Sequence, residues 1–191
     1  MSNGWIPGWA AVLWVLVYSV IAFWHLGHLA VMSSGGGRLW HAAHVLMAAG
    51  MADMFWPWGG MPAGGGAGEA VFAGAAVGYL TLVLTLAGHG RGGEAGRFWA
   101  RTSAGLAVMS YMFALMSVRY LVVITVALAG WQLTEAVAWA TGRLGTSGGG
   151  PAVRVSLALM SAGMAYMLVA MQFGLAGAGP GGPGMPGMPG M

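Results

Sequence analysis

Six apolar stretches of about 20 residues, separated by short glycine-rich segments, limit how this chain can fold. A helix of about 20 apolar residues spans the ~30 Å hydrocarbon core of a bilayer. Only 6% of the 191 residues carry a charge, against roughly 25% in a typical soluble domain, so a water-facing surface cannot be built. The pattern predicts an all-α, polytopic transmembrane bundle. We expect six helices at about 9–32, 39–58, 70–88, 98–116, 120–140 and 153–174.

Two parts of the chain depart from this regular pattern. The boundary between the fourth and fifth stretches, Ser117–Arg119, contains neither glycine nor proline. We still expect a break there, because one helix over 98–140 would be ~65 Å long at ~1.5 Å per residue. The last residues, 177–191, are rich in glycine, proline and methionine, a composition that does not fold by itself. We expect a disordered tail after a six-helix domain that covers 1–176.

The arginines predict the orientation in the membrane. Six of the seven arginines lie near the first, third and fifth connections, and only Arg119 lies near another connection. The positive-inside rule places the arginine-rich connections in the cytoplasm, so both termini are expected outside, in a multi-pass plasma-membrane protein. The small basic excess is a topology signal, so the expected partner is the lipid bilayer and not nucleic acid. The six arginines are Arg38, Arg91, Arg97, Arg101, Arg143 and Arg154.

Four histidines are the first candidates for a binding site. His25 and His28 lie near the end of the first predicted helix, and His41 and His44 lie near the start of the second. The short connection predicts an antiparallel hairpin, so all four imidazoles should share one depth near the cytoplasmic face. Residues three apart share a helical face, so each pair can converge on one ligand. Ionisable residues inside a membrane are costly and point to function.

Methionines extend this pattern along three helices. They recur at spacings of three and four residues, so each set follows one stripe of its helix. Thioether sulfur is a soft ligand that selects Cu(I), and imidazole also binds copper. A methionine stripe is also typical of ordinary core packing. The candidate metal ligands beside the histidines are Met32, Met47, Met51, Met54, Met109, Met112, Met116, Met160, Met164, Met167 and Met171.

Other chemistries have little support in the sequence. Cysteine is absent, Asp53 lies off the methionine stripe, and Glu135 stands alone, so neither a thiolate site nor a carboxylate cluster is expected. No catalytic residues are predicted, and a non-enzymatic role is favoured. We expect a membrane protein that binds Cu(I) for import, storage or delivery to a cuproenzyme. Two alternatives stay open: a b-type haem protein with histidine axial ligands, and a structural or accessory membrane subunit.

The second predicted helix carries a resemblance to a known family. It reads H-x-L-M-x-x-x-M-x-x-M-x-W-P-W from His44 to Trp58. This segment resembles an uncharacterised family of small multi-spanning membrane proteins of actinobacteria, known as a domain of unknown function. The resemblance implies a polytopic fold and a membrane location, and it implies no particular chemistry.

Overall fold

The structure is a bundle of six α-helices. The computed structural model describes residues 8–33, 35–56, 66–88, 94–115, 121–144 and 150–174. The predicted all-helical architecture with six helices is confirmed, and the predicted break at Ser117–Arg119 and the tail lie outside the described residues. The helices are α1 (Gly8–Val31), α2 (Gly35–Met54), α3 (Gly66–Gly88), α4 (Glu94–Ala114), α5 (Val122–Ala140) and α6 (Pro151–Gly174).

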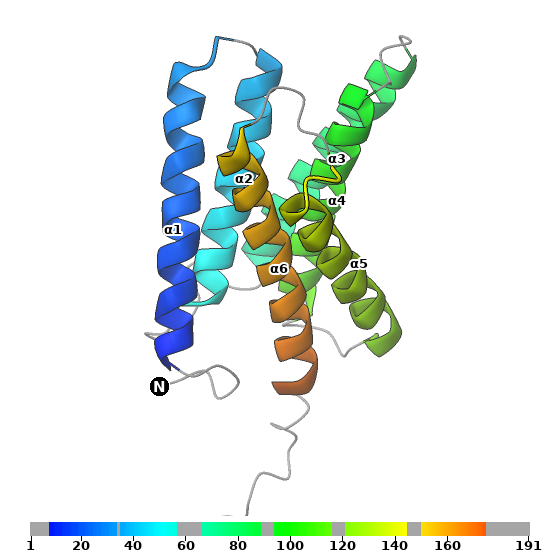
Figure 1. Ribbon diagram of the computed structural model, residues 1–191. Helices are drawn as coiled ribbons and strands as arrows, with labels where there is room; N and C mark the ends of the chain where they lie inside the picture. Colours follow the sequence, from blue (N-terminus) through cyan, green and yellow to red (C-terminus); the bar gives the residue numbers. More distant parts are fainter. Residues whose placement is uncertain are drawn as a thin grey trace, which may run out of the picture.

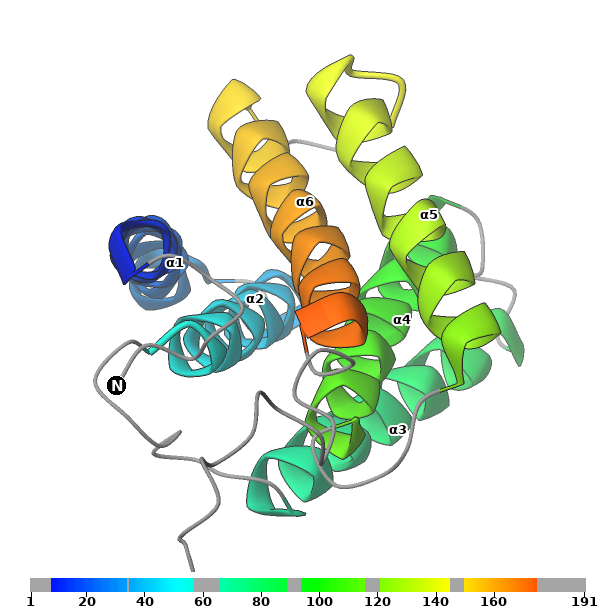
Figure 2. The ribbon, with the colours of Figure 1, turned by 90° about the horizontal axis from the view of Figure 1, so that it is seen from below.

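Consecutive helices pair into three antiparallel hairpins, α1–α2, α3–α4 and α5–α6 (Figures 1 and 2). Contacts between the hairpins are much sparser than contacts within them, and they run from α2 to α4 and from α6 to α1, α2 and α4. The start of α1 and the end of α6 lie at the same end of the bundle (Figure 1). This arrangement is compatible with an even number of membrane-crossing helices. The expected position of both termini outside the cell stays a prediction.

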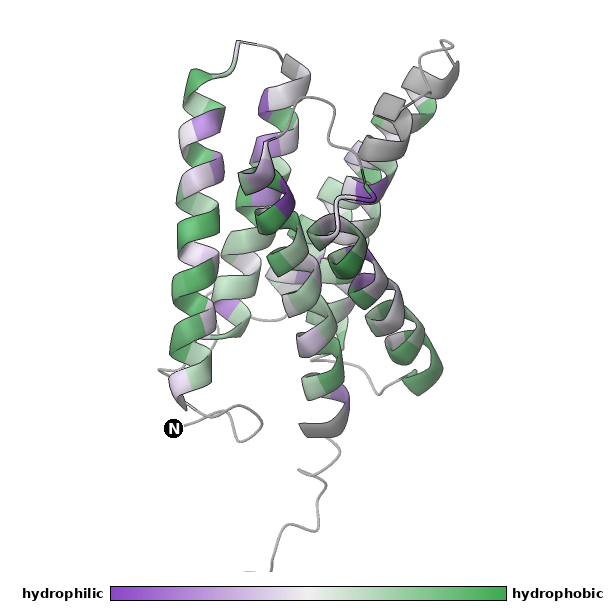
Figure 3. Ribbon diagram, in the orientation of Figure 1, coloured by the Kyte–Doolittle hydropathy of each residue, from purple (hydrophilic) through white to green (hydrophobic). Residues whose placement is uncertain are grey.

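Three helices, α1, α5 and α6, are long and apolar enough to cross a membrane. On α1, the side that faces away from the bundle is apolar as well as the side that packs inward (Figure 3). A helix that is apolar all round is typical of a membrane span. The outward stripe of α1 consists of Trp9, Leu13, Leu16, Val20 and Phe23, and its buried stripe includes Ala11, Val15, Tyr18 and Ile21.

The ends of several helices differ from the apolar stretches that predicted them. α2, α3 and α4 begin at Gly35, Gly66 and Glu94, each four residues ahead of the expected starts at 39, 70 and 98. The added first turns are glycine-rich or charged, which suits a helix end whose unpaired backbone N–H groups need water. α2 ends at Met54, before the expected end at 58. Pro57 explains this, since the residue before a proline is disfavoured in the helical conformation.

The core where the hairpins meet is rich in sulfur. Nine methionines from α2, α4 and α6 are each at most 4% exposed and belong to one buried cluster. Their flexible side chains can fill the irregular space between hairpins that touch at few places. These residues are Met47, Met51, Met54, Met109, Met112, Met160, Met164, Met167 and Met171.

Tyr18 brings α1 and α6 close together. The Tyr18 hydroxyl donates a hydrogen bond to the Leu159 carbonyl at 3.4 Å, and its ring is fully buried. The Tyr18 hydroxyl also occupies the place where a Cβ on Gly163 would lie. The absence of a side chain at Gly163 therefore allows this contact between the first and third hairpins.

We expect Gly163→Ala to lower the thermal unfolding midpoint in detergent, because the added methyl group overlaps Tyr18 and overpacking costs roughly 1–3 kcal/mol. Gly130→Ala is the matched control, since a Cβ at Gly130 meets no atom within 4 Å. Its midpoint should stay the same or rise, because alanine is favoured over glycine in helices by about 1 kcal/mol. Equal midpoints for the two variants would contradict the close approach.

Candidate metal site

The four predicted histidines lie together at one end of the α1–α2 hairpin. The ring centroids of His25 and His44 are 5.1 Å apart, and those of His28 and His41 are also 5.1 Å apart. Hydrophilic residues of α1 and α2 gather in the same half of the hairpin (Figure 3). His25, His41 and His44 are buried, whereas His28 is exposed. The hairpin geometry expected from the sequence thus brings the imidazoles together.

Within this cluster, His25 uses both ring nitrogens for hydrogen bonds. Its Nδ1 lies 2.8 Å from His41 Nδ1, and its Nε2 lies 2.9 Å from the Ser156 hydroxyl on α6. Two nitrogens that bind one ion at ~2.0 Å each would lie more than ~3 Å apart. In this arrangement the His25–His41 contact is a hydrogen bond that helps to join three helices.

No group of three or more His, Cys, Asp or Glu side chains that could hold a metal ion occurs in the part of the chain that the structure describes. A site formed by His25, His28, His41 and His44 alone therefore stays a prediction. Methionine is not among these four residue types, and methionine sulfur lies beside His44, next to the histidine cluster.

His44 has the hydrogen-bond arrangement of a metal ligand. Its Nδ1 lies 2.8 Å from the Trp40 carbonyl, one helical turn earlier. A carbonyl only accepts, so Nδ1 carries the proton and Nε2 keeps its lone pair. Metal-binding histidines commonly donate their second N–H to such an acceptor, which fixes the tautomer and the ring orientation. His28 makes the same contact with the Trp24 carbonyl at 2.9 Å, but it lies on the surface.

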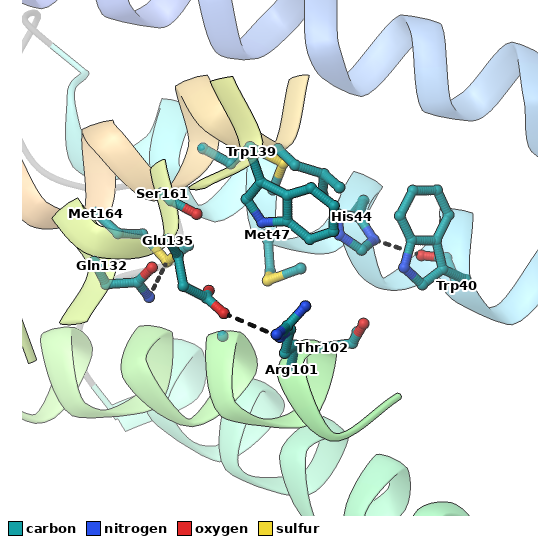
Figure 4. Close-up of a pocket in the computed structure, with 13 residues that line it drawn as sticks. Trp40, His44, Met47, Arg101, Thr102, Gln132, Glu135, Trp139, Ser161 and Met164 are labelled. Carbon is teal, nitrogen blue, oxygen red and sulfur yellow. Dashed lines mark hydrogen bonds and ion pairs between the residues drawn. The ribbon is translucent and has the colours of Figure 1, made fainter. Parts of the chain in front are cut away.

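His44 borders a cavity of about 40 Å³ where the three hairpins meet (Figure 4). α2 contributes imidazole and sulfur, α4 and α5 contribute charged and amide groups, and α6 contributes sulfur and hydroxyl. A water molecule needs at least about 10–15 Å³ by this kind of measure, so a small ion or a few waters fit. The lining includes His44, Met47, Arg101, Thr102, Gly105, Gln132, Glu135, Met160, Ser161 and Met164.

Three of the predicted methionine ligands, Met47, Met160 and Met164, line this cavity. A Cβ at Gly105 would lie 3.2 Å from Met47 Sδ, so the bare glycine makes room for that sulfur. Six others, Met51, Met54, Met109, Met112, Met167 and Met171, are buried in the core and do not line it. Met32 is 39% exposed, and Met116 lies outside the described residues.

Sequence reasoning missed the charged side of the cavity. Glu135 has no second carboxylate beside it in the cavity lining, but its Oε1 lies 3.5 Å from Nε of Arg101 on α4, a partner that the sequence did not reveal. Figure 4 shows both side chains and Met47 pointing toward one another. Gln132 is fully buried; its Nε2 donates to Met164 Sδ at 3.4 Å, and its Oε1 has no hydrogen-bond partner among the described residues. One acid in an apolar helix was the signal that could have revealed this pair.

The comparisons with known proteins add a family match over part of the chain. Residues 36–121 match the model of a family described as a domain of unknown function, DUF5134. The expected resemblance to an uncharacterised domain family is confirmed over this range, which includes α3, α4 and all of α2 except its first residue. The actinobacterial source and the motif stay predictions. No curated protein and no solved structure matches the chain.

We expect Ser156→Ala to lower the stability of the bundle, because it removes the hydrogen bond that joins His25 on α1 to α6. Such bonds between membrane helices contribute about 1 kcal/mol, so the thermal unfolding midpoint in detergent should fall measurably. Ser19→Ala is the matched control, since the hydroxyl of Ser19 has no partner among the described residues. A fall of equal size in both variants would show that the His25–Ser156 bond contributes nothing specific.

Proposed function

We propose that the chain is a multi-pass plasma-membrane protein that binds Cu(I) in the cavity between its three hairpins. The observation that carries this proposal is the meeting of one imidazole and three thioethers around one small space. His44 offers an unprotonated Nε2, and sulfur comes from Met47 on α2 and from Met160 and Met164 on α6. The protein would import Cu(I), store it or deliver it to a cuproenzyme.

The chemistry of these donors supports Cu(I) over other metals. Imidazole and thioether are both neutral, and soft sulfur ligands prefer Cu(I), whereas Mg²⁺ and Ca²⁺ need several oxygen ligands. Glu135 is the one carboxylate in the cavity lining, which is too few for a hard cation. The remaining buried methionines are proposed as a relay through the core, in line with their position between α2, α4 and α6.

The two alternatives have less support. A haem needs a slot within the range of roughly 300–1,000 Å³ that cofactor pockets occupy, whereas the cavity beside His44 has about 40 Å³. A structural role has one favourable observation, since His25 is engaged at both ring nitrogens and packs in the core. Met→Leu substitutions, which remove sulfur and keep the side-chain volume, distinguish the two roles, because they should lower metal affinity only under the copper role.

We also propose that all six helices cross the membrane, with both termini outside the cell. In a reporter-fusion series, fusions after Gly36 and Gly93 should report the cytoplasm, and fusions after Ala63 and Met191 should report the outside, because arginine-rich connections stay inside. The inverted pattern would place the histidine cluster at the outer face. Ends that report different sides would contradict an even number of crossings.

We expect the triple variant Met47→Leu, Met160→Leu and Met164→Leu to lose Cu(I) affinity by roughly tenfold or more, because three ligands disappear. Leucine keeps nearly the same volume, so the fold should persist. The measurement is competition with bicinchoninate under anaerobic conditions, using the full chain in detergent. The matched control is Met109→Leu, Met112→Leu and Met167→Leu, three buried methionines that do not line the cavity.

The control variant should keep the affinity of the unchanged protein. Equal Cu(I) binding by both triple variants would assign the methionines to packing and remove the main support for the cavity site. If the unchanged protein holds no Cu(I), the structural role becomes the better explanation.

A further inference from the structure

The Arg101–Glu135 ion pair borders two spaces, one between the three hairpins and one between α4 and α5. Both residues line the cavity that His44 borders, and both also line a groove of about 400 Å³ between α4 and α5. The Glu135 side chain is 14% exposed, whereas the Arg101 side chain is 39% exposed and lies over the Trp139 ring at 5.9 Å. The carboxylate therefore stays inside the bundle, while the guanidinium can reach the groove on its long stem.

The charges of the cavity lining have to balance when a cation enters. A buried carboxylate without a partner is strongly destabilised, so Glu135 needs a positive charge nearby. Arg101 supplies this charge in the present structure. The other donors, which include His44, Met47 and Gln132, are neutral. A Cu(I) ion added beside the intact ion pair would leave one uncompensated positive charge within the membrane, which is costly.

We propose that Glu135 is the counter-charge for a monovalent soft cation in this cavity. Arg101 is a tethered cation, that is, a positive charge fixed to the protein, and it pairs with Glu135 when no metal cation is bound. This inference rests on the proposed Cu(I) site and adds two residues to it. On binding, the cation takes over Glu135, and the Arg101 guanidinium moves along the groove between α4 and α5. This groove extends to Leu144, beyond the end of α5 at Ala140, where water can solvate the displaced charge. The net charge of the site stays the same before and after the exchange.

Gln132 fits this role as a further oxygen donor. Its Oε1 is buried in the cavity wall and lacks a partner among the described residues, while its Nε2 is held by Met164 Sδ. An unpaired buried carbonyl oxygen is costly, and a bound cation would satisfy it. Exchange of one positive charge for another also favours monovalent ions, since a divalent ion would leave an excess charge.

The test compares Arg101→Gln with Glu135→Gln in the full chain in detergent, by Cu(I) competition with bicinchoninate. Removing the tethered cation should raise the affinity roughly tenfold, and removing the counter-charge should lower it roughly tenfold, because one charge interaction at short range is lost in each case. Arg154→Gln is the matched control: it removes the same charge from α6, and Arg154 does not line the cavity. It should leave the affinity unchanged.

Opposite shifts in the two variants support the exchange, because loss of a purely structural ion pair would change both affinities in the same direction. Shifts in the same direction, or no shift, in a protein whose unchanged form binds Cu(I) would overturn the exchange and leave the proposed Cu(I) site intact. Absence of Cu(I) binding by the unchanged protein and by both variants would overturn both. Thermal unfolding of each variant shows that the compared proteins are folded.

Discussion

The apolar interior of the bundle offers no water to polar groups, and this constraint decides where the buried polar side chains of this chain lie. Each helix satisfies its own backbone, but a buried imidazole or carboxylate must find a partner, either on its own helix, as His44 does at the Trp40 carbonyl, or on another helix. His25 reaches Ser156, which joins the first hairpin to the third. Arg101 reaches Glu135, which joins the second hairpin to the third. Polar contacts therefore lie at the junctions where the hairpins otherwise touch at few places.

The buried methionines fill the apolar part of the junctions between the hairpins. Hairpins that meet at few places leave irregular gaps, and an unbranched thioether side chain adapts to them better than leucine or valine. Packing and metal binding are therefore compatible roles for one residue type. Position decides between them: Met47, Met160 and Met164 border a cavity, whereas Met109 and Met112 are enclosed by other side chains.

Much of the fold could be predicted from the sequence, because apolar stretches of membrane length specify helices directly. The proximity of His25 to His41 could also be predicted from the sequence, because the short connection between the two helices determines which of their residues lie at the same level of the hairpin. The cavity could not be predicted, because it depends on how the three hairpins rotate against one another. Arg101 and Glu135 are 34 positions apart, on helices that make few backbone contacts, so only the packing of the bundle reveals their pairing.

If the cavity holds Cu(I) as proposed, its size and charge favour a carrier or donor over a store. A space of about 40 Å³ has room for one ion, whereas a store needs many sites. Neutral sulfur and nitrogen ligands bind Cu(I) without strong electrostatic attraction, and under the proposed exchange the competing Arg101 guanidinium would weaken the bound state further. Both features lower the barrier to release. A protein that held Cu(I) in the proposed way would be suited to pass one ion onward, because Arg101 could restore the charge balance at Glu135 as the metal leaves.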